Sequence, residues 1–268
     1  MDTDKGKILR VRDLTVTAGK RRIVDRVSFD LCPGKVAALV GESGSGKTIT
    51  ALSVLDLLPP GVERAGGSAL FNGKNIFDLT PEGKRAMRGN KIAMVFQEPF
   101  TSLNPVMRVG KQIREAVDAH IKMPGLLLEK RIVELLEMVK LPPDTASRYP
   151  HELSGGMRQR IVLAMALSCG ADVMIMDEPT TALDVSIQSD ILKLVKKLQH
   201  ENKFAILFIT HDFSIVNNIA DEVYVMRQGC IVENGKTKDV LTAPRHAYTR
   251  HLLDCIPRLG DKRVRLPV

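Results

Sequence analysis

The sequence has few aromatic residues: no tryptophan, three tyrosines and eight phenylalanines among 268 residues. A core with so few rings must be built mainly from aliphatic side chains, which is typical of a buried parallel sheet covered by helices. Hydrophobic residues make up 44% of the chain. We therefore expect one large domain, or two closely joined subdomains, with a sizeable core.

Long hydrophobic runs are also missing. No segment approaches the roughly 20 consecutive apolar residues that a membrane-spanning helix needs. The first residues, MDTDK, are charged and lack the apolar centre of a signal peptide. We therefore expect a protein that is made and kept in the cytosol and that reaches a membrane only through a partner.

The four cysteines, at positions 32, 169, 230 and 255, form no C-x-x-C pair. This spacing favours free thiols over a metal site or a disulfide. The net charge of +8 would suit nucleic acid, but the basic residues are spread along the chain and no base-stacking aromatics accompany them. A solvated basic surface near phosphates or anionic lipid heads is therefore the favoured interpretation.

The hydrophobic pattern predicts an α/β fold. Polar and apolar residues alternate over residues 8–31 around a break at positions 18–20, which indicates a β-hairpin-like pair. Beyond it, predicted strands (36–40, 68–71, 91–96, 173–176, 205–210 and two short ones near the end) are interspersed with predicted helices (47–58, 185–199, 212–220). Such alternation is typical of a parallel sheet. The helix-only region of about 100–165, with helices at 106–141 (broken at 124–125) and 153–169, is the predicted second subdomain.

A phosphate-binding loop follows the strand at 36–40. The sequence GESGSGKT at 41–48 fits G-x-x-x-x-G-K-[ST], with a strand before it and a helix after it. Glycines let backbone N–H groups turn toward phosphate oxygens, and the helix presents its positive end. The predicted nucleotide-binding residues are Gly41, Ser43, Gly44, Ser45, Gly46, Lys47 (at the β- and γ-phosphates) and Thr48 (also an Mg²⁺ ligand). The alternative, a glycine-rich turn with a chance lysine, is disfavoured by the flanking elements.

Two further strands end in chemically active residues. The strand at 173–176 leads into Asp177 and Glu178, and the strand ending at 210 leads into His211. Strand ends of open α/β sheets face the ligand crevice, and unpaired carboxylates are too costly to bury. Asp177 suits an Mg²⁺ shell, Glu178 the base that activates water, and His211 a γ-phosphate contact that supports the base. A helix-capping acidic pair and a surface histidine are the alternatives.

The sequence LSGGMRQR at 153–160 resembles the signature motif of the nucleotide-binding domains of ABC transporters. The resemblance implies a P-loop NTPase core of mixed sheet with parallel strands, an N-terminal antiparallel β subdomain and a helical signature-motif subdomain. It implies that Ser154, Gly155 and Gly156 face the nucleotide bound by a second subunit, so that two subunits enclose two ATP molecules. Gln97 resembles the Q-loop glutamine, which contacts Mg²⁺ or water and senses the membrane subunit. Asp184, in TALD, resembles the D-loop residue that crosses the dimer interface.

One feature departs from the family pattern. An aromatic residue usually stacks on adenine from the early hairpin turn, whereas this turn reads AGKRR at 18–22. A base–aromatic stack contributes about 1–3 kcal/mol, so we expect weaker adenine binding, with an arginine plane as a partial substitute.

Three segments resemble the peptide and nickel importer branch: QEPFTSLNP at 97–105, DEPTTALDV at 177–185 and PRHAYTR at 244–250. The methionine of SGGM resembles the first of the two non-identical ATPases of such importers. The resemblance implies a heterodimer with a sister ATPase, two permease subunits, an external binding protein and a place on the cytoplasmic face of the cell membrane. We expect an ATPase domain over 1–240 and a short C-terminal extension over 241–268.

The short extension and the absent adenine aromatic resemble the nickel-importer ATPase, so nickel is the expected cargo, with a dipeptide or oligopeptide as the alternative. An ABC ATPase that acts on nucleic acid is a more distant alternative, since no coiled coil or C-x-x-C pair accompanies the core. A regulator that binds ATP without turnover is disfavoured by Glu178.

Overall fold

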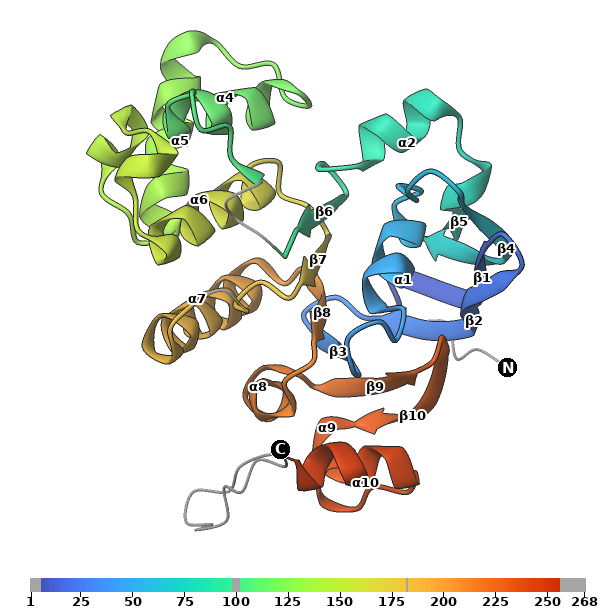
Figure 1. Cartoon of the computed structure of the whole chain (residues 1–268). Coiled ribbons are helices and arrows are strands. Elements are labelled where there is room, and N and C mark those ends of the chain that lie inside the picture. Colours follow the sequence, from blue (N-terminus) through green and yellow to red (C-terminus); the bar gives the residue numbers. More distant parts are fainter. Residues whose placement is uncertain (1–5, 98–101, 182, 256–268) are drawn as a thin grey trace.

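The computed structural model describes residues 6–97, 102–181 and 183–255. Its first sheet is antiparallel, in the order β2-β1-β4-β5 (Figure 1). The strands are β1 (Leu9–Ala18), β2 (Arg21–Leu31), β4 (Val62–Phe71) and β5 (Lys74–Asn75). The turn between β1 and β2 confirms the hairpin predicted over 8–31. The strand predicted over 68–71 begins earlier, because β4 pairs with β1 as far as Val62.

The second sheet carries the site and has the order β10-β9-β3-β8-β7-β6. Its strands are β3 (Val36–Val40), β6 (Ile92–Val95), β7 (Val173–Asp177), β8 (Ala205–Thr210), β9 (Glu222–Arg227) and β10 (Cys230–Lys236). All neighbours pair in parallel except β9 and β10. Every residue of β3, β7 and β8 is buried, since both faces of the sheet are covered.

Helix α1 (Lys47–Val54) packs between the two sheets, where Ala51 and Val54 share a core with residues of β1 and β7. On the opposite face of the mixed sheet lies α7 (Val185–Asn202). Near β9 and β10 lie α8 (Phe213–Ile219), α9 (Thr237–Thr242) and α10 (Ala247–Asp254). The helix α2 (Pro81–Met87) and the 3₁₀ turn η1 (Ile76–Asp78) follow β5.

A helical lobe lies at the end of the mixed sheet that β6 forms (Figure 1). It contains α4 (Val109–Asp118), α5 (Gly125–Met138), α6 (Gly155–Leu167) and the 3₁₀ turns η2 (Pro143–Ser147) and η3 (Pro150–Glu152). Its buried side chains, such as Ile113, Leu135 and Ile161, join a core that continues onto Met176 and Phe208 of the sheet. The lobe is thus packed directly against the strands that carry the site.

The predicted α/β architecture, with an N-terminal antiparallel sheet and a helical region, is present. The break predicted at 124–125 is also confirmed, since α5 begins at Gly125. Two details differ. The helix predicted over 47–58 stops at Val54, because Asp56 adopts a left-handed conformation (φ 53°). The short helices α2, α9 and α10 were not predicted. None of the described helices is long and apolar enough to cross a membrane.

Candidate active site

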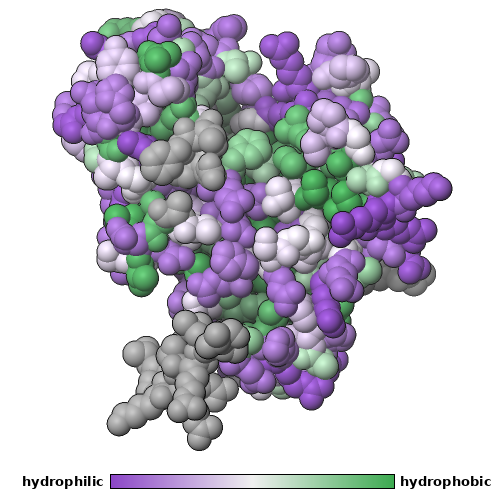
Figure 2. Space-filling view, in the orientation of Figure 1, coloured by the Kyte–Doolittle hydropathy of each residue, from purple (hydrophilic) through white to green (hydrophobic). Residues whose placement is uncertain are grey.

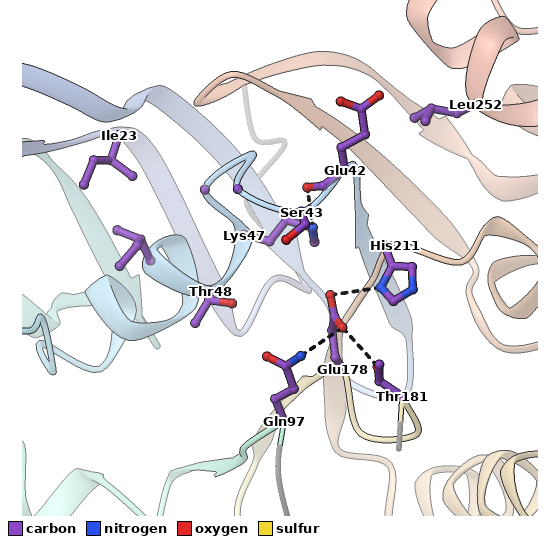
Figure 3. Close-up of a pocket in the computed structure, with 13 residues that line it drawn as sticks. Ile23, Glu42, Ser43, Lys47, Thr48, Gln97, Glu178, Thr181, His211 and Leu252 are labelled. Carbon is purple, nitrogen blue, oxygen red and sulfur yellow. Dashed lines mark hydrogen bonds and ion pairs between the residues drawn. The ribbon is translucent and has the colours of Figure 1, made fainter. Parts of the chain in front are cut away.

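Four loops that follow parallel strands surround a cavity of about 630 Å³ (Figure 3). The P-loop follows β3, Gln97 follows β6, Glu178 follows β7 and His211 follows β8. The carboxyl ends of parallel strands meet at one edge of the sheet, which is where ligands bind in open α/β folds. The cavity lining comprises Ile23, Glu42, Ser43, Gly44, Gly46, Lys47, Thr48, Ile49, Gln97, Glu178, Thr181, His211 and Leu252.

The lysine of the P-loop lies under the loop itself. Nζ of Lys47 donates hydrogen bonds to the carbonyl oxygens of Gly41 (2.8 Å) and Glu42 (2.9 Å). Burial lowers the pKa of Lys47, while the nearby carboxylates of Glu178 and Asp177 oppose that shift. A desolvated ammonium group that donates to two neutral carbonyl oxygens is well placed to bind phosphate oxygens, which are stronger acceptors.

Two glycines of the loop leave no room for a side chain. A Cβ atom on Gly41 would lie 2.1 Å from the carbonyl oxygen of Met226, and one on Gly46 would lie 2.9 Å from that of Ile23. Gly46 is also the N-cap residue of α1 and has a left-handed backbone conformation (φ 106°), which favours glycine. These contacts explain why the motif requires glycine at both positions: the backbones of the neighbouring strands β9 and β2 lie too close to the loop for a Cβ atom.

The Glu178 carboxylate is held at both oxygens (Figure 3). Oε1 lies 3.1 Å from Nδ1 of His211, whereas Oε2 accepts hydrogen bonds from Nε2 of Gln97 (3.3 Å) and Oγ1 of Thr181 (3.0 Å). The backbone of Glu178 has φ 45°, a strained conformation for a residue with a side chain. Such strain is concentrated at functional sites, where the surrounding structure enforces it.

Asp177 lies beneath the cavity at the end of β7 and is only 2% exposed. Burial raises the pKa of its carboxyl, although the Thr48 hydroxyl donates a hydrogen bond that acts in the opposite direction. Its Oδ1 atom is buried and has no hydrogen-bond partner among the residues that the structure describes. A carboxylate oxygen without a partner, next to a hydroxyl, is a suitable ligand pair for Mg²⁺, which prefers oxygen donors.

The predicted signature and D-loop residues do not line the cavity. Ser154 is exposed and caps α6, its Oγ accepting a hydrogen bond from the N–H of Met157 (3.3 Å). Gly155 faces Leu183, which precedes α7, and Gly156 faces Ile187 in the first turn of α7. The exposed Asp184 is the N-cap residue of α7. Ala182 of the same motif, like residues 98–101 after Gln97, lies outside the described residues.

The cavity is also lined by residues that were not predicted from the sequence. Thr181 belongs to the TALD motif, so its sequence position was a usable signal. Ile23 and Leu252 come from β2 and α10, and no local pattern links either to the P-loop. The four cysteines are free, and within residues 6–97, 102–181 and 183–255 no group of three His, Cys, Asp or Glu side chains forms a metal site.

Two family models match the chain. The model described as "ABC transporter" covers residues 24–181, more than half of the chain. The model described as "Oligopeptide/dipeptide transporter, C-terminal region" covers residues 232–267. The second match includes the PRHAYTR segment and most of the expected extension.

Several curated proteins are similar over nearly the whole chain. "Oligopeptide transport ATP-binding protein OppD" of Bacillus subtilis is 46% identical over 94% of this chain and 73% of its own length. "Dipeptide transport ATP-binding protein DppD" of the same organism is 44% identical, over 94% and 78%. "Peptidoglycan transport ATP-binding protein YejF" of Agrobacterium fabrum is 49% identical over 96% of this chain, which spans about half (48%) of that relative.

Solved structures confirm the fold. The structure of cbiO1 from Clostridium perfringens, part of the ABC transporter complex cbiONQ, has a TM-score of 0.80 at 28% identity and covers 89% of this chain and 92% of that one. The dimeric cassette MJ0796, bound to ADP and Pi, has a TM-score of 0.75 at 25% identity, covering 85% and 98%. The antiparallel subdomain and mixed sheet are those of an ABC ATPase. The chain therefore belongs to the ATP-binding subunits of ABC transporters, in the branch that shares its C-terminal region with oligopeptide and dipeptide transporters, and is an ATPase.

Proposed function

We propose that this chain hydrolyses ATP in the cavity between the P-loop and Glu178 and thereby powers a peptide importer. Glu178 accepts a proton from the attacking water, since its carboxylate borders the cavity and is held at both oxygens. Gln97 and Thr181 orient the carboxylate. His211 reaches the γ-phosphate side of the cavity and supports the base. The anchored Glu178 carboxylate is the observation that carries the hydrolytic part of the proposal.

Lys47 and the backbone N–H groups of the P-loop bind the phosphates of ATP. The residues proposed for this role are Gly41, Ser43, Gly44, Ser45, Gly46, Lys47 and Thr48. Mg²⁺ would be held by Thr48, Asp177 and Gln97, which the unpartnered Oδ1 of Asp177 supports. When bound, the metal neutralises charge on the phosphate oxygens. The protein itself fixes the position of the Glu178 carboxylate at the edge of the cavity.

A second ATPase subunit completes each site in this proposal. Ser154, Gly155, Gly156 and Asp184 lie outside the cavity of their own chain, and Ser154 and Asp184 are exposed. They would contact the nucleotide and the interface of the partner. The dimeric state of the similar cassette MJ0796, bound to ADP and Pi, supports such an arrangement. We propose a heterodimer with a non-identical sister ATPase, as the SGGM sequence implies.

Peptides are the proposed cargo, in place of the nickel expected from the sequence. The extension that favoured nickel matches a model described for oligopeptide and dipeptide transporters. The relatives named above are described as transporting oligopeptide, dipeptide and peptidoglycan, and none of these three as transporting nickel. The absent adenine aromatic concerns the nucleotide, not the cargo. It therefore carries less weight than the C-terminal match.

Two permease subunits and an external binding protein would complete the transporter, with this chain on the cytoplasmic face of the membrane. Phe96, next to Gln97, is 44% exposed, and Leu57 is 39% exposed. Figure 2 shows hydrophobic residues gathered on the visible surface in the region of α1. Exposed apolar patches of this kind favour protein contacts.

We also propose the division into an ATPase domain (1–240, helical subdomain about 100–165) and a C-terminal extension (241–268).

Uptake of a labelled dipeptide and of radioactive nickel, in cells that express the whole transporter, tests the cargo. We expect Glu178→Gln to abolish dipeptide uptake and to leave nickel uptake unchanged. Loss of nickel uptake with intact peptide uptake would instead establish a nickel importer. The nucleic-acid alternative requires hydrolysis that duplex DNA stimulates with a steep salt dependence, and we expect no such stimulation.

A further inference from the structure

We propose that Tyr248 of α10 is a positioning residue for the nucleotide site: its hydroxyl fixes the P-loop backbone at Glu42 and so sets the affinity for ATP. The inference rests on the nucleotide site proposed above, but not on the transported cargo. It gives a function to the PRHAYTR segment, for which the hydrolytic mechanism has no role.

The contact joins two ends of the chain. The backbone N–H of Glu42 donates a hydrogen bond to Oη of Tyr248 (3.2 Å), across 206 positions of sequence. The carbonyl oxygen of the same residue accepts a hydrogen bond from Nζ of Lys47 (2.9 Å). The Glu42 backbone is therefore held from one side by α10 and from the other by the phosphate-binding lysine. When ATP recruits the lysine, the tyrosine hydrogen bond remains to hold this part of the loop.

The tyrosine itself is firmly placed. Its side chain is 5% exposed, and the guanidinium group of Arg227 lies over the ring, 4.8 Å from its centre. Burial raises the pKa of the Tyr248 phenol, although the hydrogen bond from the Glu42 N–H lowers it in part. The phenol therefore keeps its proton, and the 3.2 Å contact shows that its oxygen accepts the Glu42 N–H.

Strand β10 fixes the helix that carries the tyrosine. Oε1 of Glu233 accepts a hydrogen bond from the N–H of Arg245 (2.7 Å), and Oε2 accepts one from the N–H of His246 (3.0 Å). Nδ1 of His246 in turn accepts the N–H of Tyr248 (3.1 Å). A continuous series of hydrogen bonds thus runs from the sheet through the C-terminal segment to the P-loop.

Helix α10 also forms part of the cavity wall. Leu252 lies four residues after Tyr248, on the same face of the helix, and lines the nucleotide cavity near Glu42 (Figure 3). The second half of the P-loop has its own anchor, since the N–H of Gly229 donates to the carbonyl oxygen of Ser45 (2.9 Å). Loss of the Tyr248 hydroxyl should therefore loosen the first half of the loop and leave the second half in place.

Tyr248→Phe tests this role, because it removes only the hydroxyl and keeps the ring beneath Arg227. Titration of the full chain with MgATP should give a Kd about two- to tenfold higher than that of the wild type, as expected for one lost hydrogen bond. In the assembled transporter, KM for ATP should rise by a similar factor while kcat stays within about twofold, because the contact serves binding rather than the chemical step.

Tyr224→Phe is a matched control. Oη of Tyr224 accepts the backbone N–H of Asp30, also at 3.2 Å, and the side chain is 8% exposed but does not line the nucleotide cavity. We expect both variants to lower Tm by similar amounts and only Tyr248→Phe to weaken ATP binding. A wild-type Kd for Tyr248→Phe, or an equal rise in both variants, would overturn the inference alone. A wild-type chain that binds no MgATP would overturn the proposed nucleotide site with it.

Discussion

Nδ1 of His211 lies 3.1 Å from Oε1 of Glu178, between the loops that follow the neighbouring strands β8 and β7. The histidine side chain is half exposed (50%), whereas that of the glutamate is 12% exposed. The Glu178 carboxylate is thus largely shielded from solvent, whereas the His211 imidazole remains accessible to a phosphate. Substitution of each residue alone can therefore distinguish the role of the carboxylate from that of the imidazole.

Glu178→Gln keeps the size of the side chain and removes its basicity. We expect ATP turnover to fall about 10²–10⁴-fold, the usual contribution of a general base, while MgATP binding persists. Phosphate release and equilibrium binding measure the two effects, with Glu201→Gln on the exposed face of α7 as the control. Normal turnover in a dimer whose partner site is disabled would refute the assignment of Glu178.

His211→Ala should lower turnover about 10–100-fold, because a hydrogen bond to a charged group contributes about 1.5–3 kcal/mol. Binding of MgATP should change less than turnover, since Lys47 and the P-loop remain. Single-turnover kinetics of His211→Ala and Glu178→Gln, and of the double variant, measure the coupling. Fully additive effects would show that the 3.1 Å contact has no part in hydrolysis.

Lys47→Ala should abolish the stabilisation that ATP provides. A ligand at 100 times its Kd raises the free energy of unfolding by about 2.7 kcal/mol, which thermal unfolding detects readily. We expect MgATP to raise Tm for the wild type and for the surface control Lys193→Ala, but not for Lys47→Ala. An unchanged ATP-induced rise in Tm for Lys47→Ala would contradict the proposed phosphate contact.

Asp177→Asn should stabilise the nucleotide-free chain at pH 7, because it removes a carboxylate whose burial disfavours the charged form. Burial raises the folded-state pKa of Asp177 above its unfolded value, so the wild-type penalty grows as pH rises from 3.8 to the folded pKa. The gain of the variant should therefore shrink as pH falls from the folded pKa to 3.8, and it should be absent below pH 3.8. Tm measured against pH checks this, and a gain that is equal at all pH values would exclude the charge as its cause.

Glu233→Ala should destabilise the chain by about 1 kcal/mol at pH 7, because two N–H groups at the start of α10 lose their acceptors. Burial alone would raise the pKa of Glu233, but hydrogen bonds, chiefly from the N–H of Arg245, hold it below 4.5. The wild-type advantage is thus present above pH 4.5 and lost as pH falls through the folded pKa. Urea unfolding of both chains across this range measures it; a difference that persists in acid would point to packing instead.

Short sequence patterns were sufficient to predict which side chains gather around the cavity. The P-loop, the acidic strand end at 177–178 and His211 each depend on a few consecutive residues, because a strand followed by a polar turn places its side chains at one edge of a parallel sheet. The structure brings Lys47, Glu178 and His211 together around one cavity, as the patterns indicated. The alternation of strands and helices likewise predicted the fold class.

Only the tertiary structure decided the contacts between distant elements. The hydrogen bond from Glu42 to Tyr248 joins residues 206 positions apart, and Leu252 reaches the cavity from a helix that the hydrophobic pattern did not predict. Neither leaves a local signal, since neither depends on the periodicity of its own segment. The left-handed backbone of Glu178 is also imposed by its surroundings. The sequence by itself determined which groups end the parallel strands and so meet at the cavity, because those positions follow from local patterns. The packing of α10 against the P-loop, which depends on contacts between distant segments, was decided only by the tertiary structure.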